Sequence, residues 1–344
     1  MATIVGIFVL GMSGQCYAGS LQSGYYSRKC SSITSTGFWP FLKFQTTDVN
    51  VEATVKAAMK AAFDKDPTIA PALLRMQFHD CFVKGCDASI LIDTNRDGSL
   101  TEKKAGPNLS VRGYNVIDSI KQTLEDYCAG VVSCADIIAM ATRDAVNFDG
   151  KVQYVVETGR LDGKESKLTN VNLPPPTISV SNSISAFSQK GLDTADMVYL
   201  LGGHTVGIAH CSLFQDRVYN FNGSGKPDPT MNSTLVNALK SKCPQPSTVD
   251  NIVPLDQTPK SALVVDKAFY NQLLMSNGIL KIDQELAIDQ HTKNIVSQLA
   301  FGNDFAQKFG QAMVKLGRVE VITDTSKGEI RKSCRSINRS IKLF

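Results

Sequence analysis

Residues 73–89 read Leu-Leu-Arg-Met-Gln-Phe-His-Asp-Cys-Phe-Val-Lys-Gly-Cys-Asp-Ala-Ser, and this stretch carries more chemical information than any other part of the chain. Arg75 and His79 stand four residues apart, so on a helix both side chains project from one face. An imidazole can take up and return a proton, while a guanidinium stabilises negative charge that develops nearby. The pair suits cleavage of a hydroperoxide O–O bond, although taken alone it is also compatible with an ordinary helix.

The second half of the stretch is rich in oxygen donors. Asp80, Asp87 and Ser89 supply two carboxylates and a hydroxyl, with backbone carbonyls between them. Such donors suit a hard cation such as Ca²⁺, although the spacing is not that of an EF-hand. A disulfide between Cys81 and Cys86 would hold the loop closed around the ion.

A third motif, Leu-Gly-Gly-His-Thr-Val-Gly at 201–207, follows an apolar helical run. His204 could serve there as a neutral axial ligand to iron. A single histidine after two glycines is more often structural. The motif gains weight because it occurs in the same chain as the first two.

The composition of the whole chain limits the possible classes of protein. With 344 residues and 43% hydrophobic content, the chain can form a large core, as one big domain or two lobes. The net charge is +4 and the Lys and Arg residues are scattered, so nucleic acid is not an expected partner. Weak association with acidic cell-wall polysaccharide and an ordinary soluble surface both fit this charge. No later stretch approaches the ~20 apolar residues of a membrane span.

The N-terminus and the cysteines point to the secretory route. An apolar stretch from Ile4 to Leu10 and small residues before Ser20 predict a signal peptide over 1–19, although its start lacks Lys or Arg. Without Cys16, eight cysteines remain, and four disulfides are expected. A zinc site is the alternative, but the close pair lacks the Cys-x2-Cys pattern. N-glycosylation sequons that support a secreted glycoprotein begin at Asn222, Asn232 and Asn338.

Local signals predict a mainly α-helical fold. Expected helices cover Val51–Phe63 after an Asn50 cap, Ile137–Val146 after a Ser133–Asp136 capping box, Met197–Leu201 after Asp193, and Phe305–Leu316 after Asn303. Strand-like alternation is confined to Tyr154–Val156. A long loop is expected over Gly150–Thr177.

The chain resembles the secreted plant (class III) haem peroxidases from Leu21 to about Ile337. The resemblance rests on Arg-x-x-Phe-His-Asp-Cys-Phe-Val-x-Gly-Cys-Asp-Ala-Ser, Gly-Gly-His-Thr-x-Gly and Asp-Gln-Glu-Leu, in that order. It implies a two-lobed helical haem peroxidase domain over 20–344, with haem b (iron protoporphyrin IX) between a distal and a proximal lobe and two calcium ions. It also implies one-electron oxidation of phenolic donors by hydrogen peroxide, in the cell wall or vacuole.

The resemblance assigns a role to individual residues. His79 matches the distal acid–base residue, Arg75 the distal charge stabiliser and Phe78 the aromatic shield beside the haem. Asn108, in Gly-Pro-Asn, matches the amide that accepts a hydrogen bond from the distal histidine and keeps its other nitrogen free. For this reason Asn108-Leu-Ser is not expected to carry a glycan.

The proximal side and the donor site are assigned in the same way. His204 matches the proximal iron ligand, and Asp283 matches its carboxylate partner. Pro174 matches the rim of the aromatic donor site. The implied disulfides are Cys30–Cys128, Cys81–Cys86, Cys134–Cys334 and Cys211–Cys243.

Two calcium sites follow from the resemblance. The distal set is Asp80, Val83, Gly85, Asp87 and Ser89, with Glu102 linked to it through water. The proximal set is Thr205, Asp256, Ser261, Val264 and Asp266. The interval from Asp256 to Asp266 is two residues longer than usual, so Asp256 is expected to be a ligand but displaced.

Three departures from the family pattern stand out. Residues 31–49, which include the only tryptophan, Trp39, interrupt the match, so 32–49 are interpreted as an atypical insertion or a gene-model artefact. Tyr154 replaces the usual core tryptophan. Gln77 and Val206 are changes close to the site that should tune activity.

Three other functions are weighed against this one. An intracellular ascorbate-type peroxidase conflicts with eight pairable cysteines. A secreted haem- and calcium-binding pseudo-peroxidase conflicts with the complete set of catalytic matches. A cysteine–histidine hydrolase around His79 and Cys81 fails because Cys81 is expected in a disulfide.

Overall fold

The computed structural model describes residues 20–36, 43–150, 152–259 and 261–339. The predicted signal peptide, Cys16 and Trp39 lie outside these residues. The fold is mainly helical, as predicted. The first half contains α1 (Val51–Lys65), α2 (Ile69–Val83), α3 (Tyr114–Tyr127) and α4 (Cys134–Gly150). The second half contains α5 (Val180–Gln189), α6 (Thr194–Leu201), α7 (Gln215–Tyr219), α8 (Ser233–Lys242), α9 (Ala268–Leu274), α10 (Lys281–Leu286), α11 (Lys293–Phe301) and α12 (Phe305–Leu316).

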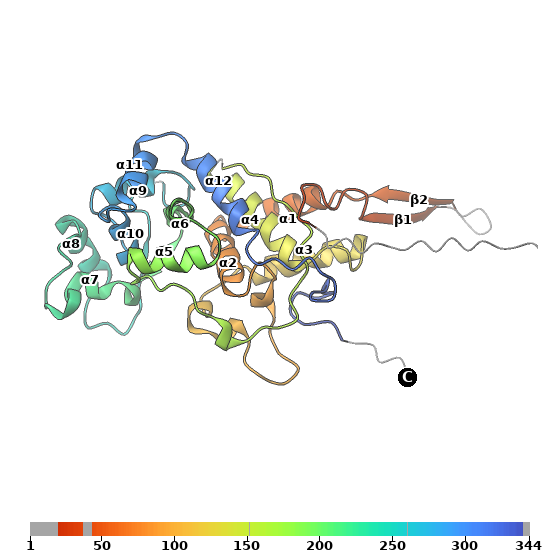
Figure 1. Ribbon diagram of the computed structural model, residues 1–344, viewed down its shortest axis with the longest axis horizontal. Coiled ribbons are helices and arrows are strands. Elements are labelled where there is room, and N and C mark those ends of the chain that lie inside the picture. Colours follow the sequence, from red (N-terminus) through yellow and green to blue (C-terminus); the bar gives the residue numbers. More distant parts are fainter. Residues whose placement is uncertain (1–19, 37–42, 151, 260, 340–344) are drawn as a thin grey trace, which may run out of the picture.

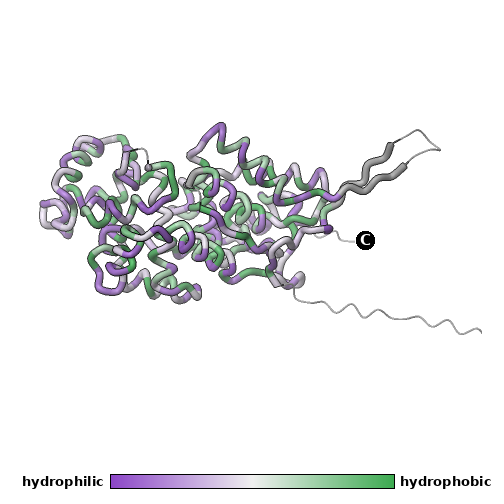
Figure 2. Tube along the Cα trace, turned by 90° about the horizontal axis from the view of Figure 1, so that it is seen from above, coloured by the Kyte–Doolittle hydropathy of each residue, from purple (hydrophilic) through white to green (hydrophobic). Residues whose placement is uncertain are grey.

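Two hydrophobic cores divide the molecule into lobes, which confirms the two-lobed architecture. One core is built mainly from α1 to α4 and the other mainly from α5 to α12. Helix α2 contributes to both, because Leu73 and Met76 are buried in the first core while Leu74 and Phe82 are buried in the second. Figure 1 shows α2 between the two groups of helices, and Figure 2 shows hydrophobic segments running through both lobes. Side chains on α2 can therefore reach the boundary between the lobes.

The predicted helix starts are largely correct. Asn50 caps α1, because its Oδ1 accepts a hydrogen bond from Ala53 N at 3.0 Å. Asp193 and Asp196 form a complete capping box at α6. The capping box predicted at Ser133–Asp136 is only half formed. Ser133 Oγ accepts from Asp136 N at 3.1 Å, but the Asp136 carboxylate instead pairs with buried Arg160 at 2.7 Å.

Helix α12 spans Phe305–Leu316, as predicted, but Asn303 is not its capping residue. The residue that precedes the helix is Asp304, which makes no side-chain capping bond and instead pairs with Lys308 at 2.8 Å. Packing therefore sets this helix start. Phe305, Phe309 and Met313 are all buried in the second core.

All four predicted disulfides are present, namely Cys30–Cys128, Cys81–Cys86, Cys134–Cys334 and Cys211–Cys243. Three of them lie in or beside the first lobe. Cys134–Cys334 ties the C-terminal segment to the start of α4 across a sequence separation of 200 residues. No helix among the described residues is long and apolar enough to cross a membrane.

The strands differ from the prediction. β1 (Ser31–Thr36) and β2 (Lys43–Asp48) form an antiparallel hairpin that projects from the helical body in Figure 1. β3 (Ile208–His210) pairs with β4 (Ile252–Pro254). The strand expected near Tyr154–Val156 is wrong. That segment is extended and runs beside α12, and it forms no strand ladder. The alternation arises because Val156 is buried in the first core while Val155 is exposed.

Candidate active site

Arg75 and His79 lie one turn apart on α2, as the spacing predicted. Arg75 Nε donates to His79 Nε2 at 3.3 Å. The rest of the guanidinium is held by the Pro107 carbonyl at 2.7 Å and by Ser110 Oγ at 3.0 Å. Pro107 and Ser110 were not singled out in the sequence, although they flank Asn108 in the same short segment. The guanidinium is thus fixed beside the imidazole.

Asn108 lies on the other side of the imidazole. It ends a short 3₁₀ turn, Gly106–Asn108, and its Oδ1 is 2.6 Å from His79 Nδ1. Its Nδ2 donates to the Glu102 carbonyl at 2.8 Å, which orients the amide with oxygen toward the histidine. His79 Nδ1 must therefore carry the proton, and Nε2 is left as the acceptor.

The electrostatics keep this imidazole neutral. Burial and the neighbouring charge of Arg75 lower the pKa of His79 from 6.5 to about 4, although the bond to Asn108 opposes the shift. His79 is therefore a neutral base at ordinary pH. Phe78, the preceding residue, stacks on Phe82 at 4.7 Å between ring centroids and forms an apolar wall with Phe187.

His204 belongs to the second lobe and follows α6 directly, in a 3₁₀ turn Gly202–Thr205. Its Nδ1 is 2.8 Å from Oδ1 of Asp283 on α10. Asp283 is 1% exposed, whereas the His204 side chain is 31% exposed, so the far edge of the imidazole faces open space. Within the described chain, no hydrogen bond reaches His204 Nε2, which could ligate a metal.

Close packing and charge both fix His204. A Cβ at Gly202 would lie 2.3 Å from Tyr270 Oη, so glycine is required for the turn to approach α9. Burial lowers the pKa of His204, but the Asp283 carboxylate outweighs it and raises the pKa overall. The charge of Arg75 also acts to lower this pKa, which places His204 within electrostatic reach of the pair on α2.

The acidic residues in the last turn of α2 and in the segment that follows it lie close together. Asp80 Oδ2 accepts from Ala88 N at 3.0 Å, and Asp87 Oδ1 accepts from Ser89 N at 2.9 Å. Glu102 Oε2 accepts from Ser89 Oγ at 3.1 Å. Asp80 Oδ1 and Glu102 Oε1 are buried without a hydrogen-bond partner in the described structure. We call residues 80–89 the distal loop.

Burial makes this group of carboxyls costly to ionise without a cation. It raises the pKa of Asp80 well above its usual value, that of Asp87 to about 6 and that of Glu102 to about 8. The charge of Asp87 raises the pKa of Asp80 and Glu102 further. Unpartnered oxygens in such a setting fit a hard cation.

The other predicted ligands of the distal loop are carbonyls. No cluster of three or more His, Cys, Asp or Glu side chains suitable for a metal occurs in the described ranges, so a cation here requires carbonyl and hydroxyl oxygens as well. Val83 O accepts from Lys190 Nζ at 3.1 Å, a contact that the sequence did not indicate. Gly85 has a φ of +96°, and a Cβ there would lie 2.3 Å from Glu320 O. Glycine at position 85 therefore allows formation of the turn that carries the Val83 and Gly85 carbonyls.

The five residues predicted for the proximal calcium also lie together. Thr205 Oγ1 donates to Val264 O at 3.3 Å, and Ser261 Oγ donates to the Asp266 carboxylate at 3.0 Å. Asp256 is buried, and its Oδ2 has no partner among the described residues. Burial and the charge of Asp266 raise the pKa of Asp256, while hydrogen bonds from Thr258, whose N donates to Asp256 Oδ1 at 2.8 Å, oppose the shift. Asp256 therefore lies within electrostatic range of Asp266, despite the longer interval.

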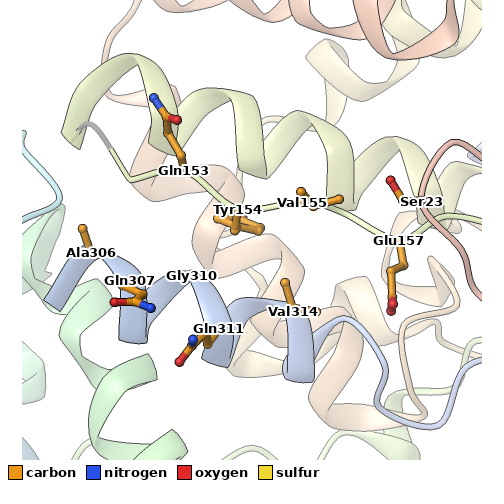
Figure 3. A pocket seen from close by; sticks show the side chains of 10 residues that line it. All are labelled: Ser23, Gln153, Tyr154, Val155, Glu157, Ala306, Gln307, Gly310, Gln311 and Val314. Atoms are coloured by element: carbon orange, nitrogen blue, oxygen red, sulfur yellow. The ribbon is translucent and has the colours of Figure 1, made fainter. Parts of the chain in front are cut away.

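Pro174 and Tyr154 were also singled out in the sequence. Neither is a hydrogen-bond partner of His79 or His204 in the described structure. Pro174 is half-buried in the segment before α5, and the same proline run meets α10 where Ile282 N donates to Pro176 O at 3.1 Å. A surface pocket of ≈ 590 Å³ lies between α12 and residues 153–157, with Tyr154 in its lining (Figure 3). This pocket contains neither of the two histidines, so we do not assign the chemistry to it.

Comparison with known proteins agrees with this geometry. Residues 55–302 match the family model described as peroxidase. The chain is 49% identical over 335 residues to Peroxidase 60 of Arabidopsis thaliana, which covers 97% of this chain and 94% of the relative. It is 44% identical over 299 residues to Peroxidase 5 of Vitis vinifera, which covers 86% of this chain and 90% of the relative. The chain is therefore an enzyme of the plant haem peroxidase family.

Proposed function

We propose that the protein is a secreted peroxidase that holds haem b and two calcium ions and reduces hydrogen peroxide while oxidising phenolic donors in one-electron steps. The observation that carries the proposal is the pair of histidines. His79 and His204 come from different lobes, and each is held at Nδ1 by an oxygen. His79 Nε2 accepts from Arg75 Nε, whereas no hydrogen bond among the described residues reaches His204 Nε2. Such an arrangement fits a planar group between the lobes.

The residues of the second lobe would hold the haem. His204 Nε2 would bind the iron, and Asp283 would make the imidazole more basic by accepting from Nδ1. When bound, the haem supplies the electron transfers to peroxide and from the donor. Phe78, Phe82 and Phe187 would keep the distal side apolar.

The residues of α2 would handle protons and charge. His79 Nε2 accepts a proton from hydrogen peroxide and returns it to the departing oxygen, which leaves as water. Arg75 stabilises the negative charge that develops on the departing oxygen. Asn108 keeps the His79 proton on Nδ1, so that Nε2 keeps its lone pair, which accepts from Arg75 Nε in this structure and would accept the proton of the peroxide.

The calcium ions would stabilise the two lobes. At the distal site, the carboxylates of Asp80 and Asp87, the Ser89 hydroxyl and the carbonyls of Val83 and Gly85 would bind one ion, with Glu102 nearby. At the proximal site, Thr205, Asp256, Ser261, Val264 and Asp266 would bind the other. The unpartnered buried oxygens of Asp80 and Asp256 support both sites.

Secretion and the phenolic donor rest on other observations. All eight cysteines outside the predicted signal peptide are paired, which suits an oxidising compartment, and we propose removal of residues 1–19 followed by delivery to the cell wall or vacuole. The half-buried Pro174 would lie at the rim of the donor site.

The test is an absorption spectrum of the purified secreted protein, recorded before and after one equivalent of hydrogen peroxide and again after a phenol such as guaiacol. We expect a Soret band that shifts with peroxide and recovers with the phenol. A protein with a Soret band that does not respond to peroxide would instead be a haem-binding pseudo-peroxidase.

A further inference from the structure

The C-terminal segment Glu329–Asn338, which we call the strap, contacts the distal loop from outside the active site. We propose that Arg331 is a positioning residue that holds the distal loop in its calcium-binding shape through backbone carbonyls. This inference rests on the proposed function, because it assumes that the loop binds calcium.

The contacts of Arg331 are with the backbone of the loop. Its Nη2 donates to Ala88 O at 2.6 Å and to Asp87 O at 3.3 Å, and its Nη1 donates to Cys334 O at 2.9 Å. The side chain is 0% exposed. Ala88 has a left-handed φ of +57° and separates two predicted ligands, Asp87 and Ser89. Arg331 therefore stabilises the strained point of the loop, at which the two ligands are turned toward each other.

Arg331 forms no hydrogen bond with the ligand carboxylates of Asp80 and Asp87 in the described structure. Its nearest carboxylate is Asp162, with Nε 3.7 Å from Oδ2, rather than Asp80 or Asp87. The Asp87 and Asp80 side chains instead accept from backbone N–H groups of the loop, and Asp80 Oδ1 keeps no partner within the described residues. Burial raises the pKa of Asp80 and Asp87, and the charge of Arg331 opposes this rise. Arg331 therefore shapes the loop through its carbonyls and also favours the ionised carboxylates that a cation needs.

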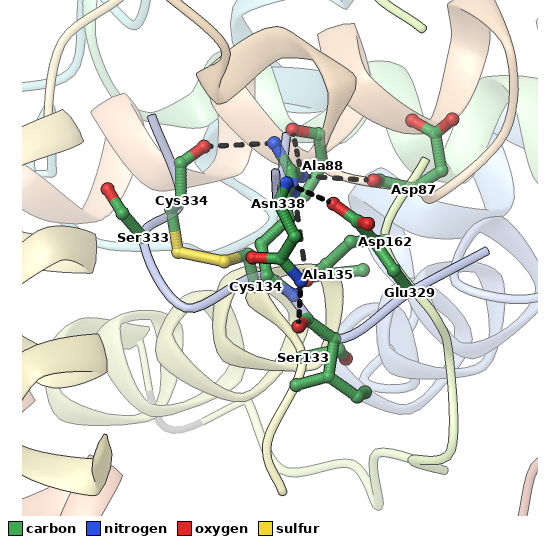
Figure 4. Close-up of polar contacts among 12 residues, drawn as sticks. Asp87, Ala88, Ser133, Cys134, Ala135, Asp162, Glu329, Ser333, Cys334 and Asn338 are labelled. Carbon is green, nitrogen blue, oxygen red and sulfur yellow. Dashed lines mark hydrogen bonds and ion pairs between the residues drawn. A yellow bond between two sulfur atoms is a disulfide. The ribbon is translucent and has the colours of Figure 1, made fainter. Parts of the chain in front are cut away.

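The strap holds Arg331 in place by three connections, which Figure 4 shows in part. Arg331 N donates to Asp162 Oδ2 at 2.9 Å, and Asp162 Oδ1 accepts from Ala135 N at 2.9 Å at the start of α4. The Cys134–Cys334 disulfide joins the same two segments. Asn338 closes the strap, because its side chain accepts from Lys332 N at 3.0 Å and donates to Ile330 O at 2.8 Å.

The same corner of the fold also supports the loop without Arg331. Gly163 N donates to Asp87 O at 2.8 Å, and a Cβ at Gly163 would lie 2.1 Å from Asp87 Oδ2. The carbonyl of Asp87 therefore accepts hydrogen bonds from both Gly163 N and Arg331. The carbonyl of Ala88, by contrast, accepts a side-chain hydrogen bond only from Arg331 among the described residues. Removing the guanidinium should loosen the loop without unfolding α2.

The experiment measures calcium release from the purified holoenzyme. Parent, Arg331→Lys and Asn338→Ala proteins are mixed with an excess of a fluorescent calcium chelator, and the rate and number of ions released are recorded. Lysine keeps the charge but cannot hold the Ala88, Asp87 and Cys334 carbonyls together. We expect Arg331→Lys to release one of two ions at least tenfold faster, and Asn338→Ala to release the same ion faster by a smaller factor.

Arg217→Lys is the matched control. Arg217 is also fully buried and also combines one carboxylate, Asp228 at 2.8 Å, with backbone carbonyls, those of Gly278 and Ile279, but it lies in the second core. It should lower the thermal midpoint while leaving release of the distal ion unchanged.

The outcomes separate this inference from the proposed function. If the parent releases two ions and both Arg331→Lys and Asn338→Ala release them at the parental rate, Arg331 is only a structural residue and the inference is wrong. The inference is also wrong if Arg217→Lys accelerates calcium release as much as Arg331→Lys does. If the parent contains no calcium, the proposed cofactor content is wrong, and the inference is withdrawn with it.

Discussion

The amide of Asn108 connects the base of the site to the acidic loop, because its Oδ1 is 2.6 Å from His79 Nδ1 and its Nδ2 donates to the Glu102 carbonyl at 2.8 Å. Glu102 in turn accepts from Ser89 Oγ. This chain of contacts joins His79 on α2 to Ser89 in the distal loop, so the calcium ion that we propose there would be coupled to the proposed base.

The first prediction concerns the proton on His79. Replacing Asn108 by valine removes the acceptor at Nδ1, so the proton can move to Nε2 and the base is lost in part of the molecules. We expect the rate of reaction with hydrogen peroxide to fall about 10- to 100-fold, as for other outer partners of a functional histidine. Stopped-flow absorbance measures this rate. Asn108→Gln is the control, since it keeps an uncharged amide with an acceptor oxygen, and a valine variant within twofold of the parent would refute the role of the amide.

The second prediction is a pH profile. The pKa of His79 is lowered from 6.5 to about 4, so the imidazole remains neutral, and able to accept a proton, down to that pH. The rate of reaction with peroxide should be constant above about pH 5 and fall about tenfold per pH unit below about pH 4. An inflection near pH 6.5 instead would mean that burial and Arg75 do not shift this group.

The third prediction concerns calcium and stability. Without the ion, burial raises the pKa of Glu102 from 4.5 to about 8. A carboxyl with a raised folded-state pKa stabilises the fold below its unfolded pKa, and this stability is lost as the pH rises through the folded pKa. Calcium-free protein should therefore lose thermal stability between about pH 4.5 and 8. Its midpoint should fall further below that of the calcium-bound protein at pH 8 than at pH 5. Calorimetry with and without a chelator tests this, and a gap independent of pH would count against a buried calcium site.

Much of the site could be predicted because its chemistry is local in sequence. Arg75 and His79 are one helical turn apart, and the distal loop spans ten consecutive residues. The pairing of cysteines came from the family resemblance, because eight cysteines by themselves allow many connectivities.

The features that sequence could not supply depend on contacts between distant segments. Arg331 is 243 residues from Ala88 in the chain, and nothing in its neighbourhood marks it as a contact of the distal loop. Lys190 is likewise remote from Val83. The alternation at Tyr154–Val156 was misleading because packing of Val156 into the first core, without any strand partner, buries one side of that extended segment. β3 and β4 are three residues each, too short for a periodic signal.

The fourth prediction concerns residues 32–49. The β1–β2 hairpin projects from the helical body in Figure 1, and Val49 N donates to Cys30 O at 2.9 Å where its two ends meet. Deleting 32–49 joins Ser31 to Asn50, the cap of α1, and removes no proposed catalytic or calcium residue. We expect the shortened protein to fold and load haem as well as the parent, judged by soluble yield and thermal midpoint. Loss of haem or of solubility would show that the segment is an integral part of the fold.

The most direct test of the central claim is the rate at which peroxide changes the Soret absorbance of parent and His79→Ala proteins. A positioned acid–base residue raises a reaction rate about 10²- to 10⁴-fold. The variant should therefore react with hydrogen peroxide at least about 10²-fold more slowly than the parent. It should still bind haem through His204. Equal haem content in the two proteins, read from the resting spectrum, is the control. A His79→Ala rate within tenfold of the parent would contradict the assignment of His79 as the base that activates peroxide.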